Sequence, residues 1–340
     1  MKGFKLIDKE TLKETDIASE KNEDLETNVK VKITKCLITL NDVLRYSGEI
    51  DCENVVLGSF GVGIVSESFN NLFGIEKGNR VYIEPYNNCN ECYNCKNGET
   101  SKCSNVLTAG EDYNGFLSDF VSVNASKVFL LPDPVSEKDA LFIGQIANAI
   151  SIIDKLGVQK GDYVAIIGND NLAVITALLL IFYQSVPILI GTDDEMINIA
   201  KESGVYYTLN SEDNWQKEVS VITGGRMAKN VVYIADSDIP ATKAFAVASY
   251  NASVAFTGNS TKASAISFAL AVKKQLEIHC INGSFGNTAT SINILANKAI
   301  DLSKLKVDTV SYEAVPKTFK ALNDKIKNEQ PIHETIVELF

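Results

Sequence analysis

The sequence predicts an α/β protein with a β-rich first domain and a second domain built on a doubly wound parallel sheet. Two observations support this prediction. Residues 1–150 contain short alternating segments separated by turns that carry glycine, and from Lys160 onward buried strands alternate with helical segments. Strands and helices that alternate at this length are typical of an open parallel sheet covered on both faces.

The first domain is expected to consist mainly of strands. Residues 29–33 and 81–83 show the alternation of half-buried strands, and a further strand is expected over 115–117 and 120–123. Between Ser136 and Leu156 the apolar positions change to helical spacing, which places a domain boundary near residue 150. The first domain is therefore predicted to span residues 1–150.

The second domain is expected to span residues 151–283. Its predicted strands are 163–167, 187–190, 231–234, 252–256 and 276–280, and an apolar helix over 172–183 follows the first of them. A second helix through Met196 is expected to stop at Gly204. Residues 284–340 have mixed character, and we expect them to return to the first domain.

Composition excludes several classes of partner. The 340-residue chain has a net charge of −11, which argues against nucleic acid or an anionic membrane as its main partner. Residues 1–16 lack the apolar core of a signal peptide, and the apolar run 172–183 is too short to span a bilayer. A cytoplasmic protein that acts on a small molecule is expected, and the identity of that substrate is not legible.

Four of the seven cysteines lie within fifteen residues, at Cys89, Cys92, Cys95 and Cys103. Four thiolates that close together can converge on one tetrahedral ion, and a site without an open position describes a structural zinc. Two alternatives remain open. Iron–sulfur runs use a shorter last gap followed by proline, where this chain has seven residues and Ser104. Disulfides are less expected in a cytoplasmic protein.

The order of these features resembles the medium-chain dehydrogenase/reductase family, whose zinc-type alcohol, polyol and threonine dehydrogenases are the nearest relatives. The resemblance covers nearly the whole chain. It rests on the cysteine lobe 89–103, on V-L-G-S-F-G-V-G-I-V at 56–65, on K-G-N-R-V at 77–81 and on the turn at Gly168. It implies a GroES-like first domain with a catalytic zinc, a Rossmann-type second domain that binds NAD or NADP, and substrate between them.

The residues that hold the catalytic zinc in that family are replaced. Where the family reads C-G-T-D-x-H-x-Y, residues 39–46 read T-L-N-D-V-L-R-Y, so that Thr39 stands in place of the first ligand. Ser59 stands in place of the ligand histidine, and residues 143–146 offer no third ligand. Neutral hydroxyls are poor zinc ligands, so we predict that the catalytic zinc is absent. Thr39, Asp42 and Ser59 remain as polar candidates, and none is assigned as the general acid.

Other residues do not rebuild such a site. Cys36 lies three residues from Thr39, and on a strand an odd offset points the two side chains to opposite faces. Cys36 and Cys52 are therefore interpreted as small buried hydrophobic residues. His279 and His333, the only histidines, are interpreted as structural or exposed.

The dinucleotide fingerprint G-x-G-x-x-G/A reads G-N-D-N-L-A at 168–173, with Asp170 in place of the middle glycine. A carboxylate at about 4 Å from a phosphate charge costs roughly 4 kcal/mol at an effective dielectric constant of ~20. Gly191 replaces the acidic residue that holds the ribose. Neither NAD nor NADP is favoured by these loops. The resemblance would place a cofactor against Gly168, Asp170, Leu172, Gly191, Thr192 and Gly258.

Two functions remain open. One is an NAD(P)-dependent reductase without catalytic zinc, in which hydrogen bonds stabilise a developing enolate. The other is a non-catalytic family member that keeps the fold and the structural zinc and serves as a binding or assembly subunit. A homodimer or homotetramer, paired through the sheet edge at residues 276–282, is expected by analogy with the family.

Overall fold

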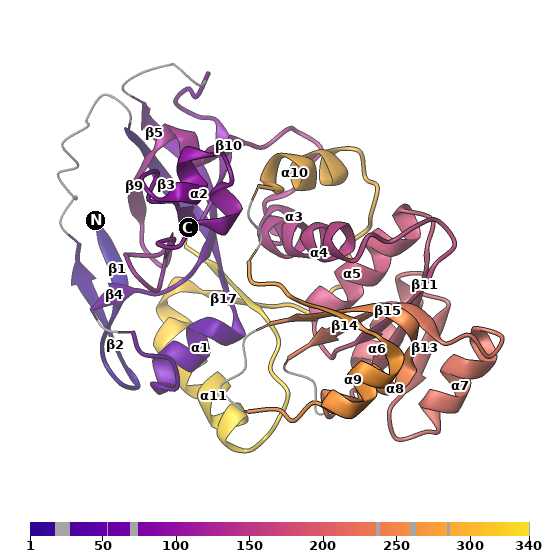
Figure 1. Cartoon of the computed structure of the whole chain (residues 1–340). Coiled ribbons are helices and arrows are strands. Elements are labelled where there is room, and N and C mark those ends of the chain that lie inside the picture. The colour runs from indigo at the N-terminus through magenta and orange to yellow at the C-terminus, as the bar shows by residue number, and fades with distance from the viewer. Residues whose placement is uncertain are drawn as a thin grey trace. The chain divides into compact units, whose positions relative to one another are not determined.

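A computed structural model of the chain describes residues 1–17, 28–52, 54–68, 74–235, 239–258, 263–283 and 286–339 (Figure 1). The chain divides into two compact units. The first unit comprises residues 1–144, 288–297 and 307–340, and the second comprises residues 145–287 and 298–306. Within the described residues, no helix combines the length and the apolar character needed to cross a bilayer.

The first unit is built on a seven-stranded sheet in the order β10-β6-β5-β3-β18-β17, with β9 paired to β3. The bounds are β3 (Asn28–Ile38), β5 (Phe60–Ser68), β6 (Arg80–Ile83), β9 (Phe120–Asn124), β10 (Val128–Leu130), β17 (Asp308–Ser311) and β18 (Thr335–Glu338). A three-stranded sheet joins β2 (Thr11–Asp16), β1 (Lys2–Asp8) and β4 (Val55–Val56), and β7 (Tyr86–Asn87) pairs with β8 (Leu107–Thr108).

Short helices complete the first unit: α1 (Leu40–Ser47), α2 (Tyr93–Lys96), η1 (Thr100–Lys102), η2 (Ala125–Lys127), α3 (Glu137–Ala140), α10 (Thr288–Ala296), η3 (Tyr312–Ala314) and α11 (Val315–Lys327). The core alternates along β3, where Val29, Val31 and Ile33 are buried. They pack in one cluster with Phe116 and with Phe319 of α11. Residues 29–33 therefore bury every second side chain, as their pattern predicts, whereas Cys36, Leu37 and Ile38 at the end of the strand are all buried.

The second unit is built on a six-stranded sheet in the order β13-β12-β11-β14-β15-β16, and every neighbouring pair is parallel (Figure 1). Its strands are β11 (Tyr163–Ile167), β12 (Val186–Gly191), β13 (Tyr207–Asn210), β14 (Ala228–Ile234), β15 (Ala248–Thr257) and β16 (Glu277–Cys280). The helices are α4 (Ile143–Leu156), α5 (Asn171–Phe182), α6 (Asp194–Glu202), α7 (Trp215–Ile222), α8 (Thr242–Val247) and α9 (Phe268–Lys274). Numbered from β11, the order is 3-2-1-4-5-6, that of a dinucleotide-binding sheet.

Both faces of this sheet are buried, as the apolar strands require. In β11, Ala165 and Ile167 pack in one cluster with Trp215 of α7 and Phe245 of α8. The intervening Ile166 is also fully buried. The predicted fold class, a β-rich unit followed by a doubly wound parallel sheet, is confirmed.

Two local predictions about the first unit were wrong. Residues 115–117 form no strand, because Phe116 and Leu117 donate their backbone N–H groups to the carbonyls of Gly58 and Leu57 rather than to a ladder. Thr39 does not lie on a strand. It is the N-cap of α1, so the odd-offset argument that separated it from Cys36 does not apply.

Candidate functional site

The cysteine lobe lies between β7 and β8, whose pairing closes the loop that carries all four thiols. The Sγ atoms of Cys89, Cys92, Cys95 and Cys103 all lie within 4.8 Å of one another. The Sγ atom of Cys89 lies 3.5 Å from that of Cys103 and 4.0 Å from that of Cys95. A tetrahedral zinc with Zn–S bonds of about 2.3 Å needs sulfurs about 3.8 Å apart. The quartet fits a zinc ion, and these separations are too long for disulfide bonds.

Backbone N–H groups orient the sulfurs. The N–H groups of Cys89 and Cys92 lie 3.4 Å from the sulfurs of Cys103 and Cys89, respectively. Backbone hydrogen bonds from Cys95 and Ser104 lower the pKa of Cys92 to about 6. Desolvation, followed by hydrogen bonds with the sulfurs of Cys92 and Cys103, raises the pKa of Cys95 to about 12. A zinc ion binds thiolates, so a cation among the four sulfurs would favour the deprotonated form of each.

The predicted polar candidates Thr39 and Asp42 are joined by hydrogen bonds. The buried carboxylate of Asp42 accepts the backbone N–H of Thr39 at 2.9 Å and its hydroxyl at 2.8 Å. Its other oxygen accepts the N–H of Gly58 at 3.0 Å. The first contact is the carboxylate half of a capping box, so these side chains start helix α1 and hold the 57–59 loop against it.

Ser59 lies beside a buried arginine that the sequence analysis did not single out. The Nη1 atom of Arg45 lies 3.4 Å from Ser59 Oγ and 3.7 Å from Asp42 Oδ1, and its Nη2 atom pairs with Glu111. Arg45 is 3% exposed. The sequence contained one sign of this role. Arg45 lies within the otherwise apolar run V-L-R-Y at 43–46, and a charged side chain that is buried requires partners.

Phe60 packs where an acidic residue would stand in the family pattern. A Cβ atom added to Gly144 would overlap the Phe60 ring, so this glycine leaves room for the aromatic side chain. Within the part of the chain that the structure describes, the cysteine quartet is the one group of three or more cysteine, histidine or carboxylate side chains close enough to share a metal.

In the second unit the fingerprint turn follows β11. A Cβ atom on Gly168 would lie 3.0 Å from a side-chain atom of Ile234 and 3.2 Å from the Cβ atom of Ala173. The close packing of the helix on the sheet therefore favours glycine at this position. Asp170 is the N-cap of α5, and its Oδ1 atom accepts the N–H of Ala173 at 2.9 Å. Leu172 is buried in the first turn of the helix.

The turns after β11 and β12 are joined by Asn169. Its Oδ1 atom accepts the N–H of Thr192 at 2.7 Å, and its Nδ2 atom lies 2.6 Å from the Thr192 hydroxyl. A Cβ atom on Gly191 would lie 2.8 Å from Asn169 Oδ1. Gly258, at the end of β15, has a positive φ of 88° and approaches the backbone of Ala235. The predicted cofactor residues thus lie at the carboxyl ends of β11, β12 and β15 in one parallel sheet, except Leu172 within α5.

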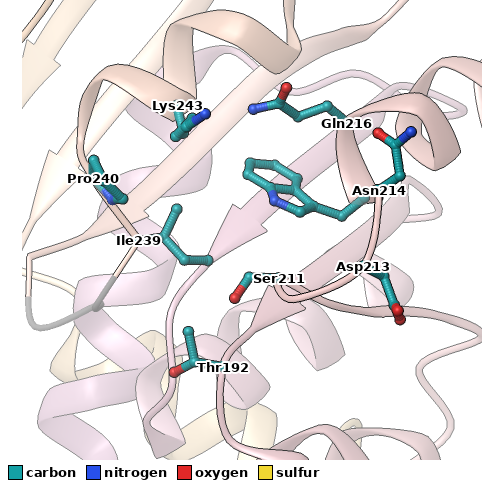
Figure 2. Close-up of a pocket in the computed structure, with 9 residues that line it drawn as sticks. Thr192, Ser211, Asp213, Asn214, Gln216, Ile239, Pro240 and Lys243 are labelled. Atoms are coloured by element: carbon teal, nitrogen blue, oxygen red, sulfur yellow. The ribbon is translucent and has the colours of Figure 1, made fainter.

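A cavity of about 320 Å³ opens at the same edge of the sheet (Figure 2). Thr192 follows β12 and Ser211 follows β13, while Ile239 and Pro240 precede α8 and Lys243 lies in its first turn. Asp213, Asn214, Trp215 and Gln216, at the start of α7, complete the lining. Figure 2 shows Lys243 and Gln216 on one side and Thr192 toward the opposite end.

Comparison with known proteins agrees with this geometry. Residues 25–133 match the model of the alcohol dehydrogenase GroES-like domain. A zinc-type alcohol dehydrogenase-like protein of Haemophilus influenzae is 25% identical over 90% of this chain and 91% of its own length. An Escherichia coli alcohol dehydrogenase (rspB) complexed with NADH superposes with a TM-score of 0.85 at 20% identity, over 100% of this chain and 99% of that one. A zinc-binding dehydrogenase from Sinorhizobium meliloti bound to NADP gives 0.88 at 19% identity, over 99% of each chain.

The fold and the cysteine lobe define a two-unit protein of the dehydrogenase type. Residues 25–133 match the GroES-like domain of alcohol dehydrogenases, and nearly the whole chain is similar to a zinc-type, alcohol dehydrogenase-like protein, which supports the medium-chain dehydrogenase/reductase superfamily.

Proposed function

We propose that this chain holds one structural zinc at Cys89, Cys92, Cys95 and Cys103, lacks the catalytic zinc of its family, and serves as a non-catalytic binding or assembly subunit. The observation that carries the proposal is the buried guanidinium of Arg45 beside Ser59. It places a fixed positive charge where the resemblance expects a zinc ligand.

The electrostatic cost of a second metal there can be worked out. A zinc ion bound to Ser59 Oγ at about 2.2 Å would lie within about 5.6 Å of Arg45 Nη1, which is 3.4 Å from that oxygen. At an effective dielectric constant of ~20, the repulsion between charges of +2 and +1 is then at least about 6 kcal/mol. The carboxylates of Asp42 and Glu111, which pair with the guanidinium, offset part of this repulsion, so the net cost is below that figure.

Metal content and turnover test this proposal together. We expect one zinc per chain by elemental analysis, and no oxidation of simple alcohols in the presence of either nicotinamide cofactor. Substitution of Cys103 by serine should lower the zinc content toward zero, whereas substitution of the exposed Cys280 should leave it unchanged. Two zinc ions per chain would contradict the proposal.

A second candidate is a zinc-independent NAD(P)-dependent reductase. It is favoured by the cavity at the carboxyl ends of β12 and β13 and by the likeness to structures that hold NADH and NADP. A dinucleotide diphosphate does not fit beside Asp170 as that carboxylate now lies, so this candidate requires the Asp170 side chain to turn away from the start of α5. Activated enones and quinones are the substrates to screen, and reduction of one of them with NADH or NADPH would favour this candidate.

We further propose that the chain is cytoplasmic and forms a homodimer or homotetramer through the edge of the second sheet. Strand β16 forms that edge, and the side chains of Phe268 and Val272 on the adjacent α9 are largely exposed. Apolar side chains beside an unpaired strand edge favour association. Native mass spectrometry tests this, and a monomeric mass would contradict it.

A further inference from the structure

Helix α8 passes into strand β15 without a turn, because Val247 is followed directly by Ala248, the first residue of the strand. The carbonyl groups in the last turn of a helix have no partner within that helix. At α8 they meet the side chain of Lys274, which lies in the last turn of α9. The Lys274 Nζ atom donates to the carbonyl oxygens of Phe245 and Ala246, at 2.9 and 3.0 Å. A third bond, of 2.6 Å, goes to the carbonyl oxygen of Ala248.

These three bonds use the whole donor capacity of Lys274. A protonated ammonium group carries three N–H donors and no acceptor, so each donor meets one carbonyl oxygen. Desolvation by burial lowers the pKa of Lys274 from its ordinary value, so the charged form needs these carbonyl groups as partners. Hydrogen bonds from a charged donor are stronger than those between neutral groups. Lys274 therefore fastens α9 to the end of α8.

The other end of α8 belongs to the cavity at the carboxyl ends of β12 and β13. Lys243 lies in the first turn of α8, Ile239 and Pro240 precede the helix, and all three line the cavity (Figure 2). Phe245 of α8 packs in one cluster with Ile239 and with Trp215 of α7, which also lines the cavity. The helix has six residues and is thus about 9 Å long. Because it is so short, a displacement of its carboxyl end also moves the end that lines the cavity.

We propose that Lys274 is a positioning residue, whose ammonium group holds α8 in place and so fixes the shape of a cavity that its own side chain does not line. Helix α9 also carries Phe268 and Val272, whose side chains are largely exposed. A partner that displaced α9 through this exposed face would therefore alter the cavity through Lys274. The inference goes beyond the proposed function, and it holds whether or not the chain turns over a substrate.

The chain contains its own probe of the cavity, because Trp215 is its only tryptophan and is 6% exposed. Lys274→Met keeps an unbranched side chain and removes the ammonium group. In the full, zinc-loaded chain, we expect this change to raise the acrylamide quenching constant of Trp215 fluorescence at least twofold. The matched control is Lys273→Met, which removes an exposed charge from the same helix and should leave the constant unchanged. No rise for Lys274→Met, or an equal rise in the two variants, would overturn the proposal.

A conservative variant guards against a general loss of folding. Lys274→Arg keeps a charged donor, so it should retain the circular dichroism of the wild type and raise the quenching constant less than Lys274→Met does. An equal or larger rise in the arginine variant would show that the positive charge and its donors are not what holds α8, and the proposal would fail.

Chemical rescue separates the ammonium group from the packing of the side chain. In Lys274→Ala, added ethylammonium can enter the space left by the lysine and offer N–H donors to the same three carbonyl groups, so the quenching constant should return toward the wild-type value. Tetramethylammonium carries the same charge without an N–H donor and should have no effect. Rescue by both ions, or by neither, would contradict the assignment of this role to Lys274.

Discussion

Removal of the buried guanidinium of Arg45 should destabilise the first unit by about 3 kcal/mol. Loss of one partner from a buried ion pair costs roughly 3–5 kcal/mol, because the remaining charge is left without compensation. The lower end applies, since Asp42 keeps three donors, from Thr39 and Gly58, and Glu111 is partly exposed and regains water. Arg45→Met keeps most of the side-chain volume, so the change tests charge rather than packing.

Urea denaturation followed by circular dichroism measures the effect. A matched control is Lys30→Met, which removes a partly exposed ion pair of 3.0 Å with Glu67 and should cost no more than about 1 kcal/mol. In the Arg45→Met background, Glu111→Gln should add little, because Glu111 has already lost its partner. A free-energy loss for Arg45→Met equal to that of the control would refute the electrostatic account of this site.

Four further outcomes follow from the structure. Gly58→Ala should cost at least about 3 kcal/mol in thermal or urea unfolding, because φ is 92° and the new Cβ atom would lie 2.5 Å from Cys36 Sγ. Gly78→Ala, with a φ of 93° and nothing within 4 Å, should cost only about 1 kcal/mol from its backbone conformation. Iodoacetamide at pH 8 should label the exposed Cys280 in preference to Cys52. Burial raises the pKa of Cys52 to about 11, so that only about 0.1% of this thiol is thiolate at pH 8. Peptide mapping by mass spectrometry measures the ratio of the two labelled cysteines. Chelation of zinc should lower the melting temperature of the first unit and expose the quartet to the same reagent, and an unchanged melting temperature would deny the metal a structural role.

Much of the second unit could be predicted from its pattern. The strand 163–167 was predicted at the bounds it has, and the helix predicted over 172–183 is α5 at Asn171–Phe182. Continuous apolar runs of these lengths have few alternatives to a sheet buried on both faces. The short strand Tyr207–Asn210 was not predicted, because a four-residue segment carries too little periodicity to be recognised.

Only part of the candidate sites could be predicted from the sequence. The cysteine quartet could be recognised because its four ligands lie within fifteen residues, so local spacing alone brings the sulfurs together. The roles of Arg45 and Asn169 could not be recognised. Arg45 acquires its role from Glu111, 66 residues away, and Asn169 acquires its role from Thr192, 23 residues away. Such partners meet only when strands and loops are placed in space.

The sequence by itself determined the fold class, the zinc-binding spacing and the replacement of the family's ligands at Thr39 and Ser59, since each depends on the identity of residues along the chain. Tertiary structure decided what the replacements do. It shows that Thr39 starts a helix, that Ser59 lies beside a guanidinium, and that Asp170 turns its carboxylate onto the end of α5. The physical reason is that a side chain's charge and hydrogen bonds acquire their effect from groups that folding, and not sequence order, brings within a few ångströms.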